Sequence, residues 1–161
     1  MYKVIGQVFS PQLNNTRDIV IYTPPSYYEN TLKPMTNVLV MHDGQNIFNA
    51  STSFGGTPWG CDKTVDRLVV QGDMEEVLII GVYNTPDRLN EYTYIYDPCY
   101  DTTLLGECVG GGGLGDIYLD FLIETAVPFV SSSGYRIETK KENLGVLGSS
   151  LGGLISCYAG E

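Results

Sequence analysis

Short apolar runs alternate along the chain with segments whose hydrophobic residues recur at helical spacing. The runs Val38–Met41 and Val77–Val82 are continuous, as expected for strands buried on both faces of a sheet. Strands are predicted at Tyr2–Val8, Arg17–Tyr22, Val38–Met41, Val77–Val82 and Asn143–Leu147, and helices at Lys63–Val70, at Asp116–Val127 (ending before Pro128) and at Leu151–Tyr158. This alternation predicts an α/β fold with a mostly parallel sheet and helices on both faces.

Composition indicates one globular domain over residues 1–161, with 43% hydrophobic residues and no repeat or linker. The 9 Lys and Arg against 19 Asp and Glu give a formal net charge of −10 at pH 7. Because nucleic acids and anionic membranes are bound through clustered positive charge, neither is an expected partner. The sequence also lacks a stretch as long and apolar as a transmembrane helix, and its N-terminus lacks the pattern of a signal peptide.

Cofactor motifs are absent from the sequence. The run Gly110–Gly113 lacks the Gly-Lys-Ser/Thr of a phosphate-binding loop and does not follow a strand into a dinucleotide-binding unit. We interpret it as a flexible lead-in to the helix that follows. The spacing of cysteine and histidine does not resemble a zinc site. The sequence therefore predicts neither a metal nor a cofactor.

Two features bear on the compartment. Asn14 and Asn49 each begin an Asn-x-Ser/Thr sequon, a candidate N-glycosylation site that is used only in a secreted chain. Cys99 and Cys108 flank a polar stretch and would staple that loop if oxidised. Sequons that arise by chance and a reduced thiol pair are the alternative. The balance slightly favours an extracellular, exported protein over a cytoplasmic one.

The most informative motif is Gly148-Ser149-Ser150-Leu151-Gly152, which fits the Gly-x-Ser-x-Gly nucleophile elbow. In α/β-hydrolases this elbow is a sharp turn between a strand and a helix, and it lifts the serine oxygen above the sheet. Ser149 does not fit the frame, because Leu147 stands where the motif needs glycine. Ser150 is therefore the predicted nucleophile, and the amide of Leu151 is a predicted oxyanion-hole donor.

The groups that would activate this serine are missing from the sequence. An α/β-hydrolase supplies its acid and then its histidine after the nucleophile, yet no Asp or His follows Ser150, and the only carboxylate there is Glu161. His42, the single histidine, precedes Ser150 and follows an apolar strand directly. We interpret it as a packed, hydrogen-bonded residue and not as the base. The chain is then either the front part of a hydrolase or a hydrolase-like protein without the chemistry.

Further motifs run in order through nearly the whole chain. They are Tyr22-Thr23-Pro24-Pro25-Ser26, Met41-His42-Asp43-Gly44-Gln45-Asn46, Trp59-Gly60 with Asp62, Gly81-Val82-Tyr83-Asn84 with Arg88 and Glu91-Tyr92, Pro128 with Tyr135-Arg136, and Gly148–Gly153. Together they resemble the putative esterase family of α/β-hydrolases, which includes enterochelin-esterase-like and feruloyl-esterase-like enzymes. The resemblance covers the N-terminal half of the family's domain.

This resemblance implies an α/β-hydrolase three-layer sandwich, truncated here after the nucleophile elbow. It also implies that the Gln45 amide is the second oxyanion-hole donor, in the loop after the third strand. Gly44 would let the backbone turn inwards there without a side-chain clash. Trp59 is a candidate pocket residue, and Asp43 either lines the pocket mouth or caps its loop.

Three functions are consistent with these features. The first is a serine carboxylic-ester hydrolase acting on a small-molecule or carbohydrate-linked ester, with the triad acid and histidine outside the given sequence. The second is a catalytically inactive hydrolase-fold protein used for binding or assembly, and the third is an acyltransferase. Because the strand before Ser150 would have one unpaired edge, we also expect a longer polypeptide or a second chain that completes the sheet.

Overall fold

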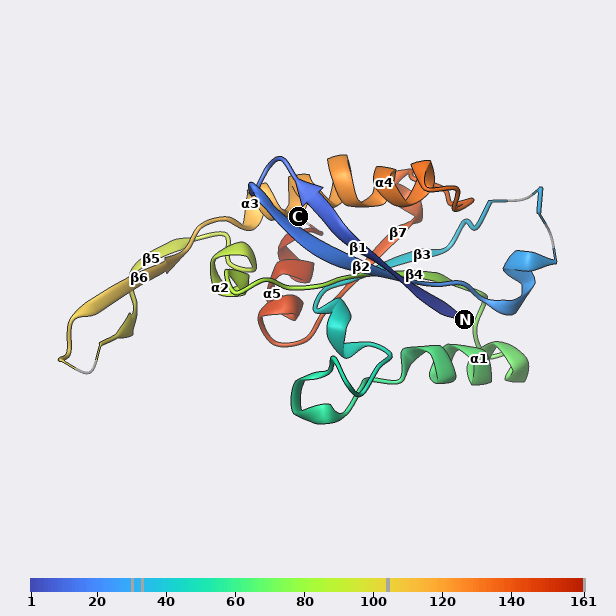
Figure 1. Ribbon diagram of the computed structural model, residues 1–161, viewed down its shortest axis with the longest axis horizontal. Helices are drawn as coiled ribbons and strands as arrows, with labels where there is room; N and C mark the ends of the chain where they lie inside the picture. Colours follow the sequence, from blue (N-terminus) through green and yellow to red (C-terminus); the bar gives the residue numbers. More distant parts are fainter. Residues whose placement is uncertain (30, 33, 104, 161) are drawn as a thin grey trace.

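The computed structural model describes residues 1–29, 31–32, 34–103 and 105–160, so that Glu161, noted above, lies outside the described residues. Within them, five strands form one sheet in the order β1-β2-β4-β3-β7 (Figure 1). The strands are β1 Tyr2–Ser10, β2 Asn15–Tyr22, β3 Val38–Met41, β4 Leu78–Val82 and β7 Leu144–Leu147. Each begins and ends within two residues of its predicted range.

The sheet is mixed and not parallel throughout. Strands β4, β3 and β7 are parallel to one another, whereas β2 is antiparallel to both β1 and β4. The sheet is therefore parallel, as expected, only among β4, β3 and β7. The physical reason is the short connection between β1 and β2, since a tight turn can join only antiparallel neighbours. The carboxyl ends of β4, β3 and β7 consequently lie at the same edge of the sheet.

Helices cover both faces of the sheet and make three layers (Figure 1). Along β4, Ile79 packs with Val65 of helix α1 (Cys61–Gln71) on one face, whereas Leu78 and Ile80 pack with Phe121 on the other face. This two-sided burial is the reason that the strand has a continuous apolar sequence. The helices are α1 Cys61–Gln71, α2 Arg88–Glu91, α3 Gly115–Asp120, α4 Val127–Ser132 and α5 Leu151–Tyr158, with short 3-10 turns at η1 Pro25–Tyr28, η2 Gly44–Asn46, η3 Phe54–Gly56 and η5 Lys141–Asn143. In the described part of the chain, none of them is long and apolar enough to cross a membrane.

The helix predicted to end before Pro128 continues past it. A π-helical segment, η4 Phe121–Ala126, joins α3 to α4, and Pro128 lies in the first turn of α4. The N–H of Val127 bonds the Leu122 carbonyl, five residues back, so the π-helical pattern reaches the residue before the proline. The prediction of a helix end was wrong because the π-helical segment resets the hydrogen-bond pattern just before the proline.

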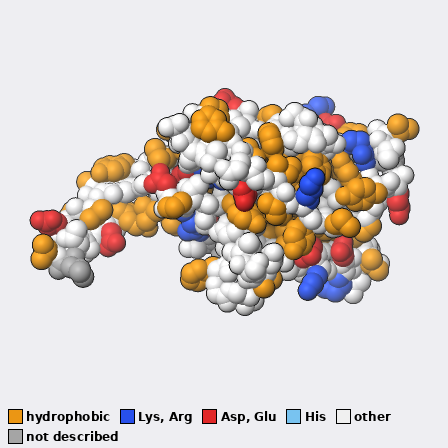
Figure 2. All heavy atoms as spheres, in the orientation of Figure 1, with side chains coloured by type: hydrophobic (Ala, Val, Ile, Leu, Met, Phe, Trp, Pro, Cys, Tyr) orange, Lys and Arg blue, Asp and Glu red, His pale blue; other side chains and the backbone are white. Residues whose placement is uncertain are grey.

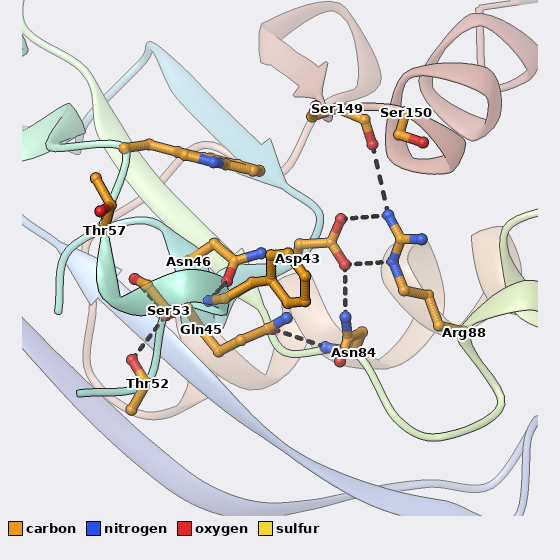
Figure 3. A pocket seen from close by; sticks show the side chains of 12 residues that line it. Asp43, Gln45, Asn46, Thr52, Ser53, Thr57, Asn84, Arg88, Ser149 and Ser150 are labelled. Atoms are coloured by element: carbon orange, nitrogen blue, oxygen red, sulfur yellow. Dashed lines mark hydrogen bonds and ion pairs between the residues drawn. The ribbon is translucent and has the colours of Figure 1, made fainter. Parts of the chain in front are cut away.

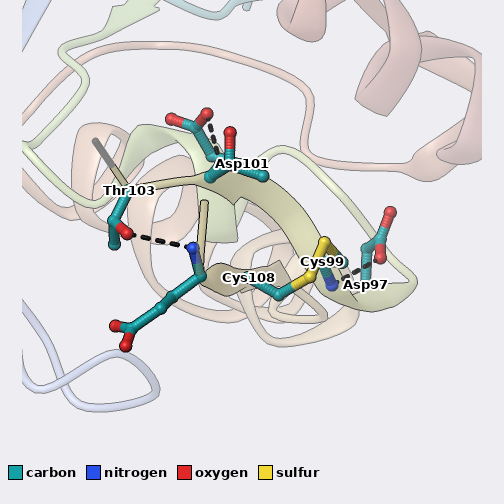
Figure 4. The surroundings of a disulfide bond; sticks show 7 residues. Asp97, Cys99, Asp101, Thr103 and Cys108 are labelled. Carbon is teal, nitrogen blue, oxygen red and sulfur yellow. Dashed lines mark hydrogen bonds between the residues drawn. A yellow bond between two sulfur atoms is a disulfide. The ribbon is translucent and has the colours of Figure 1, made fainter. Parts of the chain in front are cut away.

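The run of glycines was also misinterpreted, because Gly110–Gly112 belong to a strand. Strands β5 Tyr96–Thr102 and β6 Cys108–Gly112 form a hairpin that projects from the body of the molecule (Figure 1). Cys99 and Cys108 are joined by a disulfide between these strands (Figure 4). Hydrophobic side chains gather along this arm (Figure 2), including Tyr96 and Tyr100, which are exposed. Glycine is required at the end of β6, since Gly112 has φ 89° and a Cβ there would lie 2.4 Å from the Ile95 carbonyl oxygen.

A buried ion pair fastens helix α2 to the sheet. Arg17 of β2 donates two hydrogen bonds to the Glu91 carboxylate, at 2.7 and 2.9 Å, and both side chains have 0% exposure. Asn15 and Thr85 donate further bonds to Glu91 Oε1, at 2.9 and 3.2 Å. The Arg17 guanidinium also lies over the Phe121 ring, 4.9 Å from its centroid. Because buried charges need both a counter-charge and hydrogen-bond partners, these contacts fix α2 in one position.

His42 is packed and hydrogen bonded, as predicted. It has 0% exposure, and its Nδ1 lies 2.8 Å from the Tyr118 hydroxyl. Its Nε2 has no hydrogen-bond partner among the described residues. Burial is the main reason that the pKa of His42 is lowered to about 4, with the charge of Arg88 adding to the effect and that of Asp43 opposing it. The imidazole is therefore neutral at pH 7.

The first prediction concerns Glu91→Gln. This substitution leaves the buried Arg17 without its counter-charge, and breaking a buried ion pair costs about 3–5 kcal/mol of unfolding free energy. Urea denaturation at pH 7 measures the loss. Glu142→Gln, at an exposed position, is the matched control and is expected to change stability by less than ~0.5 kcal/mol. Equal stabilities of the two variants would contradict this account.

The second prediction concerns the pH dependence of stability. A folded-state pKa of about 4 lies below the unfolded value of ~6.5, so the unfolded chain binds more protons between these pH values. Stability should therefore fall as the pH drops from 6.5 to 4, with a contribution from His42 of roughly 3 kcal/mol. His42→Asn keeps a group that can bond Tyr118 but removes this titration. Urea unfolding of both proteins at several pH values measures the difference, and identical pH dependences would refute the assignment.

Candidate active site

Three segments meet at the edge of the sheet where β4, β3 and β7 end, and they line a cavity of about 620 Å³. In open α/β sheets, ligands bind beyond the carboxyl ends of the strands. Figure 3 shows Asp43 and Gln45 from the segment after β3, Asn84 and Arg88 from the segment after β4, and Ser149 and Ser150 from the turn after β7. Residues that are distant in the sequence thus surround one space.

The turn between β7 and α5 places Ser150 at the cavity. Ser150 has φ 57° and ψ −123° and directly precedes the first residue of α5. Non-glycine residues rarely adopt a positive φ, and such strain concentrates at functional sites. A Cβ at Gly148 would lie 2.4 Å from the carbonyl carbon of Gly152, so the backbones before and after the serine are in direct contact. Gly148 is therefore required by the packing, whereas a Cβ at Gly152 would make a tight contact of 3.3 Å with Asp43 Oδ2.

The segment after β3 turns inwards against β4. Asp43 has φ 56° and ψ 45°, a left-handed conformation that Asp adopts more readily than most residues. A Cβ at Gly44 would lie 2.5 Å from the carbonyl carbon of Gly81, which agrees with the expected need for glycine there. Gln45 lines the cavity, and its Oε1 accepts a hydrogen bond from the Asn84 N–H at 3.2 Å.

Asp43 lines the cavity and is also the most heavily bonded residue of the site. Its carboxylate accepts hydrogen bonds from Arg88 Nε at 2.7 Å, from Arg88 Nη2 at 2.8 Å and from Asn84 Nδ2 at 2.7 Å. Its N–H donates to the Tyr92 hydroxyl at 3.2 Å. The hydrogen bonds to Asp43 raise the pKa of Arg88, and burial, together with the Asp43 charge, raises the pKa of Tyr92. Arg88 is therefore a permanent cation and Tyr92 a neutral phenol at pH 7.

Two aromatic residues also line the cavity. Trp59 lines it, as expected for a pocket residue, together with Phe54, whose side chain is 91% exposed. Asn46 holds both in place, because its Oδ1 accepts from the Phe54 N–H at 2.8 Å and its carbonyl accepts from the Trp59 N–H at 2.8 Å. The cavity therefore offers aromatic rings as well as polar groups.

The structure also places the other residues for which the sequence predicted a role. Leu151 is the first residue of α5, so its N–H is one of those that a helix leaves without an intrahelical acceptor. Asn14 and Asn49 are exposed, as glycosylation sites must be. Their roles, like those of Ser150 and Gln45, stay predictions. Among the described residues, no three His, Cys, Asp or Glu side chains gather where they could hold a metal ion.

Sequence reasoning assigned no role to Asn84, Arg88 or Tyr92. All three occur in one of the motifs quoted above, but the motif does not say what they contact. Arg88 and Asp43 are 45 residues apart, and their pairing depends on how β3 and β4 align in the sheet. The available signal was the position of both motifs directly after apolar strands.

Comparison with known proteins identifies related sequences. The family described as putative esterase matches residues 10–160. The uncharacterized protein YbbA of Bacillus subtilis (strain 168) is 26% identical over 143 residues, which are 89% of this chain and 50% of that protein. The chain thus spans about half the length of the curated relative it matches.

Solved structures with a similar fold include several hydrolases. An IroE-like serine hydrolase from Shewanella oneidensis is 25% identical with a TM-score of 0.67, and the match covers 99% of this chain and 46% of that one. A ferulic acid esterase is 21% identical with a TM-score of 0.64, and the match covers 99% of this chain and 55% of that one. The enterobactin esterase FES from Shigella flexneri is 19% identical with a TM-score of 0.63, over 99% of this chain and 33% of that one.

Proposed function

The chain belongs to the putative esterase family, and on this premise we propose that it is the N-terminal part of a serine carboxylic-ester hydrolase with Ser150 as nucleophile. The observation that carries the proposal is the backbone of Ser150, whose positive φ at the start of α5 directs the turn into the cavity. Strain of this kind is the property of a nucleophile elbow, since the sharp turn exposes the serine oxygen above the sheet.

In the proposed reaction, Ser150 Oγ attacks the acyl carbon of the ester and forms a tetrahedral intermediate. The amides of Leu151 and Gln45 donate hydrogen bonds to its oxyanion, and one such donor typically contributes about 3–4 kcal/mol to transition-state stabilisation. A general base takes the Oγ proton and returns it to the leaving oxygen, so that the intermediate collapses to an acyl-enzyme and the alcohol, and water then hydrolyses the acyl-enzyme to the acid and free serine. Leu151 and Gln45 suit this role because they lie in the two segments that flank the cavity from β7 and β3.

The general base must come from another part of the protein. His42 is unsuited because it is fully buried, it is hydrogen bonded to Tyr118, and its pKa is lowered to about 4. We propose that an acid and a histidine outside residues 1–161, from the same polypeptide or a second chain, complete the triad. The position of β7 at the sheet edge, with Leu147 47% exposed, supports an added partner there.

The cavity suits an ester with one flat apolar group. Phe54 and Trp59 offer rings to such a group, and polar side chains line the rest of the cavity. Two of the similar structures are described as a ferulic acid esterase and as an enterobactin esterase in the presence of 2,3-dihydroxy-N-benzoyl-serine. The feruloyl and dihydroxybenzoyl groups are both aromatic acyl groups. We propose a small-molecule or carbohydrate-linked ester of an aromatic acid as substrate.

The third prediction concerns Ser150→Ala. Removing a serine nucleophile lowers kcat by about 10⁴-fold or more, and it should abolish labelling by a fluorophosphonate probe. Ser149→Ala changes the neighbouring exposed serine and is the matched control, which should still be labelled. Hydrolysis of an activated aryl ester and mass spectrometry of the labelled protein measure both effects.

Each outcome separates the proposal from its alternatives. A whole protein that neither hydrolyses esters nor reacts with the probe would contradict the proposal and favour a binding or assembly role. Labelling that survives in Ser150→Ala and is lost in Ser149→Ala would show that the nucleophile is Ser149 and not Ser150. Transfer of the acyl group to an added alcohol in preference to water would instead identify an acyltransferase.

A further inference from the structure

The Asp43 carboxylate connects two segments of the site that follow different strands. Its side chain is 3% exposed, and it forms a two-point ion pair with Arg88 and a hydrogen bond with Asn84. A buried carboxylate needs an opposite charge and donors for its lone pairs. This acidic group therefore ties the segment after β3 to the segment after β4.

The same ion pair also contacts the turn after β7. A Cβ at Gly152 would lie 3.3 Å from Asp43 Oδ2, so the carboxylate packs against the first turn of α5. Arg88 Nη2 donates a long hydrogen bond of 3.5 Å to the Ser149 carbonyl (Figure 3). Arg88 thus contacts Asp43 and the backbone next to Ser150 at the same time.

Asn84 extends this connection to the second candidate oxyanion donor. Its side chain bonds Asp43 at 2.7 Å, and its N–H bonds the side chain of Gln45 at 3.2 Å. Gln45 and Leu151 would have to point at one oxygen atom, although they lie on segments that follow different strands. The contacts of Asp43 and Arg88 link these segments, together with the hydrogen bond from the His42 N–H to the Leu147 carbonyl at 3.0 Å.

We propose that Arg88 is a positioning residue, which fixes the Gln45 segment against the Ser150 turn through its ion pair with Asp43 and neutralises the Asp43 charge beside the forming oxyanion. The inference rests on the proposed function. Without the guanidinium, a negative carboxylate would lie beside the site where negative charge develops, and the link between the segments would be lost. Arg88 Nε and Nη2, the fork that would grip a substrate carboxylate, are already bonded to Asp43.

The test is a double-mutant cycle of Arg88→Met and Asp43→Asn in the whole protein. The measurements are kcat and KM for an activated aryl ester and the rate at which a fluorophosphonate labels Ser150. Arg88→Met should lower kcat about 100-fold with little change in KM, since a small misplacement of reacting groups has an effect of that size. The double variant should be no slower than the slower single variant, because the two residues act as a unit.

Several results would overturn the inference. A folded Arg88→Met protein with unchanged kcat, or with a higher KM alone, would show that Arg88 does not position the reacting groups. Single-variant effects that multiply in the double variant would show that Arg88 and Asp43 act independently. If Ser150 of the unaltered protein is not labelled, the proposed function and the inference both fail. Normal labelling of Ser150 together with an insensitive Arg88→Met variant overturns the inference alone.

Two milder variants keep the test decisive if Arg88→Met does not fold. Arg88→Lys keeps the charge but loses the two-point geometry, so its kcat should fall about tenfold. Asn84→Ala removes one hydrogen bond to Asp43 without a change in charge, and it should lower kcat several-fold. Wild-type kcat in both variants would overturn the inference. Arg67→Met is the control, since Arg67 lies exposed on α1 and bonds Gln71, and it should leave kcat unchanged.

Discussion

The geometry of the site depends on a single helical turn, α2, whose residues form two ion pairs. Glu91 of this turn pairs with Arg17 of β2 in a fully buried position, and Arg88 at its start pairs with Asp43 after β3. Buried charges are stable only beside their partners, so each pair restricts the other through the turn that joins them. The sheet thereby determines where Arg88 lies, and Arg88 in turn determines where Asp43 and its loop lie.

Close backbone contact is the second condition for this site. Gly44 lies against Gly81, and Gly148 lies against Gly152, in both cases nearer than any side chain would permit. The first contact brings the loop after β3 onto β4, and the second folds α5 back onto the end of β7. Without either contact, the turn that carries Ser150 and the loop after β3 would not face the same cavity. Ion pairs and glycine contacts therefore act on the same two segments.

The sequence predicted those features that depend on local pattern. Continuous apolar runs located β3 and β4, and the position of Leu147 excluded Ser149 from the motif frame. The ion pairs could not be predicted, because the pairing of Asp43 with Arg88 follows from the register of β3 on β4, which no local pattern reveals. Local rules also failed at Pro128 and in strand β6. There, a π-helical segment and the pairing with β5 override the usual preferences of proline and glycine.

The central claim is that Ser150 carries the acyl group during turnover. The most direct measurement is a rapid acid quench of the whole protein during turnover of an activated ester, followed by proteolysis and fragment mass spectrometry. The account predicts a peptide whose mass is increased by the acyl group, with the added mass assigned to Ser150. An acyl group on another residue, or turnover with no acylated peptide at any quench time, would contradict it.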